Sequence, residues 1–522
     1  MSLRTLIERH LQTAAGAYMP NHFLLTLDAD TPFITGPDDN PVADPRLFHI
    51  FFHEYWHYLQ NVTTVSGFKS FAFTQHLLPP FSKTLLRNAD GTSVGAGALT
   101  PQERTNIRTL LDLHNDLDGE DAPTDAIGRD WDVDFQVVGI SLLHTTRAYA
   151  TQKVPNPIVT LDVECTWPNG SRAPERLHLG ARSIEESVAF LAEEQVRQTI
   201  ATASFDPPPV FPYRVAERTL QYIFGYPPPA FITAALGTLA LLTTHPGPAL
   251  IELARRFHAE VQVGKDYDSA LGTVQRVHQP SVTRIISTIL DHDLPSLEQI
   301  HQGRGLLEGA LIHVGSTIRR ALVRRLTDPL FDVRSVFPTA NHTSVKALQR
   351  DFPSCDVLQE RVPVSGVFPR DIIVSFDPSG PDALGNAPSI YTRSLQAQQD
   401  FVCAHLDNTG SFSPSGQCHS SCPYYDACRL PLRNSHPSVC EHMPWIAQSQ
   451  PGDSCWYATA VAATLGRVQI RRHTPAALWR FSDRIRKEAY QLWEVVRSVI
   501  TRRIGFRLKK KVRVNVDNTG GA

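Results

Sequence analysis

Apolar and polar positions along the chain predict a protein built mainly of buried and amphipathic helices. Residues 48–64, FHIFFHEYWHYLQNVTT, are apolar or aromatic on nearly every side of a helix, so they predict a buried helix. Asp44 can cap this helix, Pro45 suits its first turn, and Gly67 follows its predicted end. Residues 101–115 predict a second helix, which an acidic loop follows.

Alternating apolar residues on both sides of a PNG turn predict a β-hairpin within residues 157–179. The next segment, 180–201, predicts a helix in which Ser183 and Glu186 form an S-x-x-E capping box. Several more helices are predicted from about residue 212 to residue 327. The predicted fold class is therefore α+β and helix-rich.

Composition predicts a folded, non-membrane protein. Hydrophobic residues make up 42% of the 522 residues and charged residues 20%, which is typical of globular proteins. The N-terminal segment, MSLRTLIERHLQTAAGAY, predicts an amphipathic helix rather than a signal peptide. The longest apolar run, within residues 227–251, has only about 15 continuous apolar or small residues, fewer than a membrane span needs. We expect an intracellular, cytoplasmic protein that does not enter the membrane.

The buried helix contains an H-E-x-x-H pattern formed by His53, Glu54 and His57. Residues four apart project from the same face of a helix, so both histidines can reach one metal ion. Zinc lowers the pKa of a bound water, and Glu54 lies where it can accept the proton of that water. The pattern predicts a zinc hydrolase site. The alternative is a core helix whose histidines hydrogen-bond to neighbouring residues.

This helix resembles the H-E-x-x-H helix of the zincin metallopeptidases. Gln60 and Thr63 stand where the metzincin branch carries a glycine and a third histidine, so the resemblance implies a third ligand from elsewhere. In the gluzincin branch that ligand is a glutamate at the start of a second helix, in an E-[GS]-x-A context. Glu186, followed by Ser187 and Ala189, fits this context.

The resemblance implies that Glu186 is the third zinc ligand, with Glu185 as the alternative. Glu193, seven residues later, is the further acidic residue that accompanies such a ligand. Glu186 lies 129 positions beyond His57, farther than in compact gluzincins, which implies a large insertion or a different subfamily. His49 lies one turn before the motif and is a further candidate ligand, although we expect its position to be incidental.

Two supporting roles are expected around the motif. Gln60, on the turn after His57, is placed to orient the site. An oxyanion-stabilising donor is also expected. The sequence does not select one among Tyr213, Tyr222 and Tyr226, each of which also suits a packed core.

A second group of metal-ligating residues lies near the C-terminus, where five of the eight cysteines fall between positions 403 and 440. Clustered cysteines in an intracellular protein favour metal binding over disulfides. Their C-x3-C-x5-C spacing permits a structural zinc ion or a [4Fe–4S] cluster, and both stay open. The predicted ligands, with Cys403 or His419 as substitutes, are Cys418, Cys422, Cys428 and Cys440.

A weaker resemblance involves residues 448–463, QSQPGDSCWYATAVAA. This segment is similar to the nucleophile segment of papain-like cysteine proteases, with Cys455 as the nucleophile and Gln450 as the oxyanion donor. His473 is the one histidine that follows, and it is much closer than that family places its base. We therefore expect Cys455 to be a buried cysteine at the start of a helix.

Charge is distributed unevenly along the chain. Residues 467–522 contain 15 Lys or Arg against 4 Asp or Glu, although the whole chain has a net charge of -2. Such a basic tail can contact nucleic acid, an anionic surface or an acidic partner, or it can simply be a solvated helix face.

Taken together, the patterns predict a zinc-dependent peptidase that hydrolyses protein or peptide substrates. The alternative is an inactive zincin-like regulatory protein that binds nucleic acid or a partner through its cysteines and basic tail. Hydrolysis of a non-peptide amide is a third possibility. We expect four segments: a zincin-like catalytic domain at 1–240, a helical domain at 241–385, a Cys-rich metal-binding module at 386–450 and a basic helical tail at 451–522.

Overall fold

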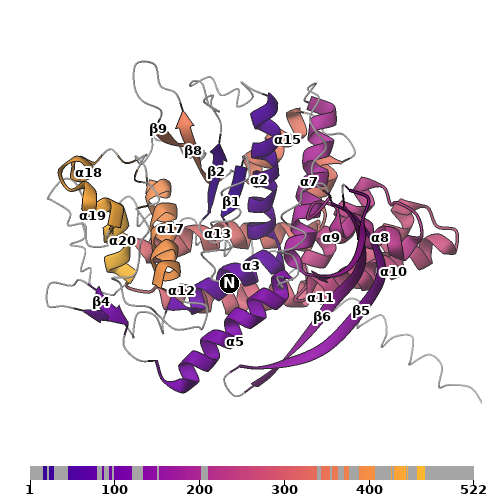
Figure 1. The fold of residues 1–522 in the computed structure, drawn as a ribbon, viewed down its shortest axis with the longest axis horizontal. Coiled ribbons are helices and arrows are strands. Elements are labelled where there is room, and N and C mark those ends of the chain that lie inside the picture. The colour runs from indigo at the N-terminus through magenta and orange to yellow at the C-terminus, as the bar shows by residue number, and fades with distance from the viewer. Residues whose placement is uncertain are drawn as a thin grey trace, which may run out of the picture. The chain divides into compact units, whose positions relative to one another are not determined.

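The protein is α+β and helix-rich, as predicted from its sequence (Figure 1). Figure 1 shows a computed structural model. Asp44, the predicted helix cap, and the basic tail lie outside the described residues. The structure describes residues 16–19, 23–28, 45–78, 85–87, 93–96, 99–119, 133–149, 152–167, 169–200, 210–337, 342–352, 355–362, 370–374, 387–405, 422, 425, 428, 430–442, 444 and 455–464.

Two consecutive helices, α2 (Pro45–Thr63) and α3 (Val65–His76), carry the aromatic motif and the segment after it. The helical conformation is interrupted at Thr64, whose backbone is extended. The Thr64 hydroxyl accepts a hydrogen bond from Gly67 N at 3.0 Å and caps α3. The prediction that this helix ends before Gly67 is confirmed, and Gly67 itself lies in the first turn of α3. It lets α3 approach α2, since a Cβ there would lie 2.3 Å from Asn61 O.

Gly67→Ala is expected to destabilise the protein by about 1–3 kcal/mol, because the new methyl group meets backbone atoms that cannot turn aside. Gly272→Ala is the matched control in helix α11 (Tyr267–Thr288), where a Cβ would meet nothing within 4 Å. That control should be neutral or stabilising by up to about 1 kcal/mol, since alanine favours helices. Denaturant titration measures both. Equal effects would contradict the close approach of α3 to α2.

Helix α7 (Ala181–Ile200) packs against α2. The predicted capping box is wrong, because Ser183 and Glu186 both lie inside the helix, which begins at Ala181. The Ser187 hydroxyl donates instead to Ser183 O at 2.8 Å and accepts from Ala216 N at 3.0 Å. A tertiary hydrogen bond therefore ties α7 to the start of α8 (Val215–Phe224).

The predicted hairpin is confirmed by an antiparallel sheet in the order β5 (Asp134–Tyr149), β6 (Gln152–Thr166) and β7 (Arg172–Leu179). Gly170 takes the positive φ of 80° that the turn between β6 and β7 requires. β5 and β6 form a long curved ribbon beside the helices (Figure 1). Leu161 and Val163 lie on one face of β6 and are buried, so this face packs against the core.

A four-stranded sheet has the order β1 (Gly16–Met19), β2 (Leu24–Asp28), β8 (Asp356–Val362) and β9 (Arg370–Val374). β1 pairs with β2 antiparallel, and β2 pairs with β8 parallel, which joins segments far apart in the chain. Among the described strands, β1 lies at the edge of this sheet. It contacts α2, where Tyr18 donates from its hydroxyl to Asn61 Oδ1 at 2.9 Å. A separate pair joins β3 (Leu85–Arg87) and β4 (Ser93–Ala96).

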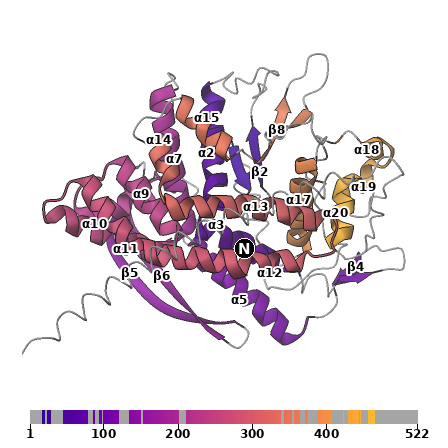
Figure 2. The same ribbon diagram turned by 180° about the vertical axis from the view of Figure 1, so that it is seen from behind.

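Further helices surround α2 and α7, and the predicted helical region from about 212 to 327 is confirmed (Figure 2). Helix α5 carries a Thr100 and Glu103 capping box at its start. Among the described helices none is long and apolar enough to cross a membrane. Beyond α8 and α11, they are α5 (Pro101–Asp118), α9 (Ala230–Leu241), α10 (Pro246–Gln262), η1 (Ile289–Asp293), α12 (Leu294–Ile300), α13 (Leu306–Thr327), α14 (Phe331–Val336) and α15 (His342–Asp351).

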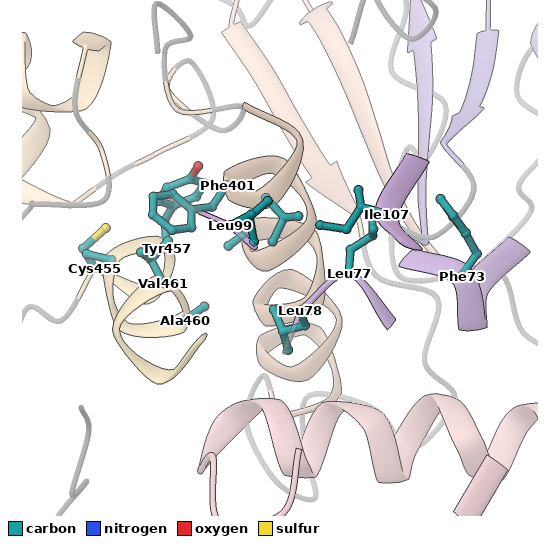
Figure 3. Packing of buried hydrophobic residues seen from close by; sticks show 13 residues of the cluster. Phe73, Leu77, Leu78, Leu99, Ile107, Phe401, Cys455, Tyr457, Ala460 and Val461 are labelled. Atoms are coloured by element: carbon teal, nitrogen blue, oxygen red, sulfur yellow. The ribbon is translucent and has the colours of Figure 1, made fainter. Parts of the chain in front are cut away.

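Helix α17 (Ala387–His405) packs against α13 and against α20 (Trp456–Thr464). Figure 3 shows apolar side chains of α17 and α20 in one cluster with residues of α3 and α5, such as Phe73 and Ile107. Two short helices, α18 (Pro431–Ser435) and α19 (Pro437–His442), precede α20. All described residues belong to one compact unit within 1–468, and the four predicted segment boundaries stay predictions.

Candidate metal centre

Helix α2 places His53 and His57 on one face, one turn apart. Their Nε2 atoms lie 3.1 Å from each other, and the two rings meet edge to face. His53 is only 7% exposed. One ring can donate to the other across this contact, and the same separation suits two nitrogen ligands of one metal ion, which accepts a lone pair from each.

Glu186 reaches the two histidines from α7. Its Oε2 atom lies 3.5 Å from His53 Nε2 and 3.3 Å from His57 Nε2. The three ligand atoms lie within 4.8 Å of one another, and no other such group of three occurs among the described residues. Zinc–ligand distances of about 2.0–2.1 Å in a tetrahedron separate the ligand atoms by about 3.3 Å. The donor set therefore fits a zinc ion.

The second nitrogen of each histidine already has a hydrogen-bond partner. His53 Nδ1 donates to Glu193 Oε2 at 2.9 Å, and His57 Nδ1 donates to Gln60 Oε1 at 3.0 Å. Gln60 in turn donates to Glu185 O at 3.0 Å. These bonds leave both Nε2 lone pairs directed toward Glu186, which is how proteins orient histidine ligands of a metal.

Three neighbouring residues that the sequence singled out lie around the ligands. Gln60 lies where an orienting role was predicted. His49 Nε2 lies 3.6 Å from Glu193 Oε1, so its contact is with the partner of His53 rather than with the ligand atoms. Glu185 offers its backbone oxygen to Gln60, and burial raises the pKa of its carboxyl to about 7.

Electrostatics at the centre favours a cation. Burial opposes a charged His53, but its contacts with Glu186 and Glu193 outweigh burial and raise its pKa well above the usual value. Burial likewise opposes a charged Glu186, but both histidines outweigh it and hold its pKa well below the usual range. Without a metal, the carboxylates therefore favour protons on the histidines, and the same negative charge attracts a divalent ion that replaces those protons.

Glu54 lies beside the histidines on α2 and is 7% exposed. Burial raises the pKa of its carboxyl, while His53 and His57 oppose that rise. The backbone N–H of Tyr18 in β1 donates to the Glu54 carboxylate and holds it in place. The carboxylate is therefore a positioned base with a stronger proton affinity than a solvated one.

Tyr213 lies beside the metal centre. The sequence did not select it over Tyr222 and Tyr226. Its ring lies 5.6 Å from the His53 ring, edge to face. Burial and the carboxylates of Glu186 and Glu54 raise the pKa of its phenol, which therefore keeps its proton and can donate it in a hydrogen bond. No local sequence pattern marks this residue.

The predicted cysteine ligands are only partly described. Cys418 and His419 lie outside the described residues, as do the side chain of Cys403 and both Gln450 and His473. The remaining predicted ligands, Cys422, Cys428 and Cys440, line one pocket. Cys455 lines the same pocket, a position that its sequence context did not indicate.

Comparison of the chain with protein-family profiles, with curated proteins and with solved structures finds no match.

Proposed function

We propose that the protein is a zinc-dependent peptidase in which His53, His57 and Glu186 bind the ion. The observation that supports this most strongly is the convergence of their three ligand atoms within 4.8 Å. Three protein ligands are typical of catalytic zinc, because they leave a position for water, whereas structural zinc has four. When bound, zinc supplies a Lewis acid that lowers the pKa of that water and polarises the substrate carbonyl.

Glu54 is the proposed base. A carboxylate oxygen of Glu54 takes a proton from the attacking water and returns it to the leaving nitrogen of the cleaved amide. The Tyr18 N–H keeps the carboxylate in position, and burial strengthens its affinity for the proton. Tyr213 is the proposed donor to the developing oxyanion, because its protonated phenol lies beside His53.

The edge strand β1 supports a peptide as the substrate. β1 pairs with β2 on one side and lies at the end of the four-stranded sheet. An extended peptide can add to such an edge through backbone hydrogen bonds. Because β1 also contacts α2 beside Glu54, a peptide bound there would lie close to the proposed base.

Elemental analysis of the full-length chain tests the zinc centre. Wild type is expected to carry about one zinc per chain at the three-ligand centre, and His53→Ala is expected to lose it together with hydrolysis of an unfolded protein substrate. His144→Ala is the matched control, because His144 is exposed on β5. If His53→Ala leaves the zinc content and hydrolysis unchanged, the proposal fails.

A regulatory protein that binds nucleic acid or a partner is the second candidate, because residues 467–522 are strongly basic. Binding of the full-length chain to nucleic acid that falls steeply with added salt, without measurable peptide hydrolysis, would favour it. The buried and positioned Glu54 favours the peptidase, since an inactive site has no need of a base.

A further inference from the structure

Four cysteines from three segments meet in one pocket that the peptidase mechanism does not use. Cys422 and Cys428 come from the loop before α18, Cys440 from α19, and Cys455 from the residue before α20. We propose that Cys422, Cys428, Cys440 and Cys455 bind a [4Fe–4S] cluster, with Cys455 in the place that sequence proximity assigned to Cys418.

Hydrogen bonds hold the cysteine-bearing segments together. Cys422 N donates to Cys440 O at 2.9 Å, and Arg433 donates to Cys428 O at 3.2 Å. The Arg433 guanidinium also lies over the Tyr425 ring, 4.5 Å from its centroid. The segment with Cys422 and Cys428 is therefore held against α18 and α19. These three parts form one frame, which carries the sulfurs of Cys422, Cys428 and Cys440.

Cys455 enters this frame from a different part of the fold. It directly precedes α20, and the backbone N–H groups of Tyr457 and Ala458 donate hydrogen bonds to its sulfur. Burial raises the pKa of the Cys455 thiol, and these two donors oppose that rise. Donors of this kind also tune a cluster that a thiolate holds. In Figure 3, Cys455 lies at the outer edge of the apolar cluster that α20 forms with Phe401.

The separation of the sulfurs distinguishes a cluster from a single zinc ion. Zinc–sulfur bonds of about 2.3 Å in a tetrahedron bring thiolate sulfurs to about 3.8 Å from one another. All four cysteines are among the described residues, yet no three of their sulfurs lie within 4.8 Å of one another. A [4Fe–4S] cluster binds each thiolate to a different iron at a different corner, so it suits four sulfurs that face one pocket at wider spacing.

The rest of the lining suits the same occupant. Leu430, Leu432 and Pro444 supply apolar walls. Apolar walls exclude water from iron–sulfur clusters and help to set their potential. A cluster bound here would join the loop and α19 to α20, and α20 packs against α17, so it would fasten this part of the chain to the core.

Anaerobic purification of the full-length chain, with iron, acid-labile sulfide and zinc measured per chain, tests the proposal. We expect about four irons and four sulfides per chain, with the visible absorption and reduced-state electron paramagnetic resonance of a [4Fe–4S] cluster. A second zinc ion per chain with no iron or sulfide would overturn the proposal. The wild-type measurement decides the metal even if a cysteine variant fails to fold.

Two variants and a control test the ligand set. Cys455→Ser is expected to lose at least half of the iron and sulfide, and Cys418→Ser is expected to keep both. Cys165→Ser, a buried cysteine of β6 remote from the pocket in sequence, is the matched control and should match wild type. Zinc at the histidine centre reports whether each variant is folded. A cluster that survives Cys455→Ser but not Cys418→Ser would overturn the role of Cys455.

Discussion

Glu54→Gln is expected to slow peptide hydrolysis by about 10² to 10⁴-fold, the contribution that a positioned general base makes. The amide keeps the size of the side chain and its place beside Tyr18 N–H, but it cannot accept the proton of the attacking water. Zinc content should stay at the wild-type value, because Glu54 is not among the three grouped ligand atoms. Steady-state hydrolysis and elemental analysis measure the two quantities.

Glu252→Gln is the matched control for this experiment, since the Glu252 side chain is 76% exposed on α10. It should leave both hydrolysis and zinc content unchanged. If Glu54→Gln keeps zinc and full hydrolysis, Glu54 is not the base. If it keeps zinc and loses hydrolysis, an inactive regulatory protein is contradicted, because the wild-type site is then catalytic.

Asp332→Ala is expected to destabilise the protein by about 3–5 kcal/mol, because it leaves a buried arginine without its counter-charge. The side chains of Arg325 and Asp332 are 0% and 1% exposed. Arg325 Nη1 donates to Asp332 Oδ1 at 2.7 Å, and Arg325 Nη2 donates to Asp332 Oδ2 at 2.5 Å. Arg325 also donates to Thr63 O and Oγ1, so the pair fixes the end of α2 against α13. Denaturant or thermal unfolding measures the loss.

The exposed pair of Arg172 and Glu164 is the control for the buried one. Their side chains are 69% and 43% exposed, so Glu164→Ala should cost less than about 1 kcal/mol. A loss for Asp332→Ala no larger than that for Glu164→Ala would show that Arg325 finds another partner or water in the variant.

Helix and hairpin positions were predictable because their signals are local. The aromatic run of α2, the capping signals of α5 and the PNG turn between β6 and β7 all depend on residues a few positions apart. The same locality explains the error in the capping box. Ser183 and Glu186 have the sequence context of a capping box, but α7 begins at Ala181, which places both residues inside the helix.

The cysteine site shows a different limit of local patterns. Cys418, Cys422, Cys428 and Cys440 are close in sequence, which made them the predicted group. Cys455 joins the pocket because α20 packs against α17, a contact between residues more than fifty positions apart. No spacing rule encodes such a contact, since it depends on which apolar faces pack together.

The sequence by itself determined that His53 and His57 share a helix face with Glu54 beside them, because residues four apart in a helix lie one turn apart. Only the tertiary structure decided which residues meet them. Packing of α7 against α2 brings Glu186 to both Nε2 atoms and Glu193 to His53 Nδ1, across more than a hundred positions of chain. Periodicity is written in neighbouring residues, whereas the partner of a helix face is set by the packing of the whole core.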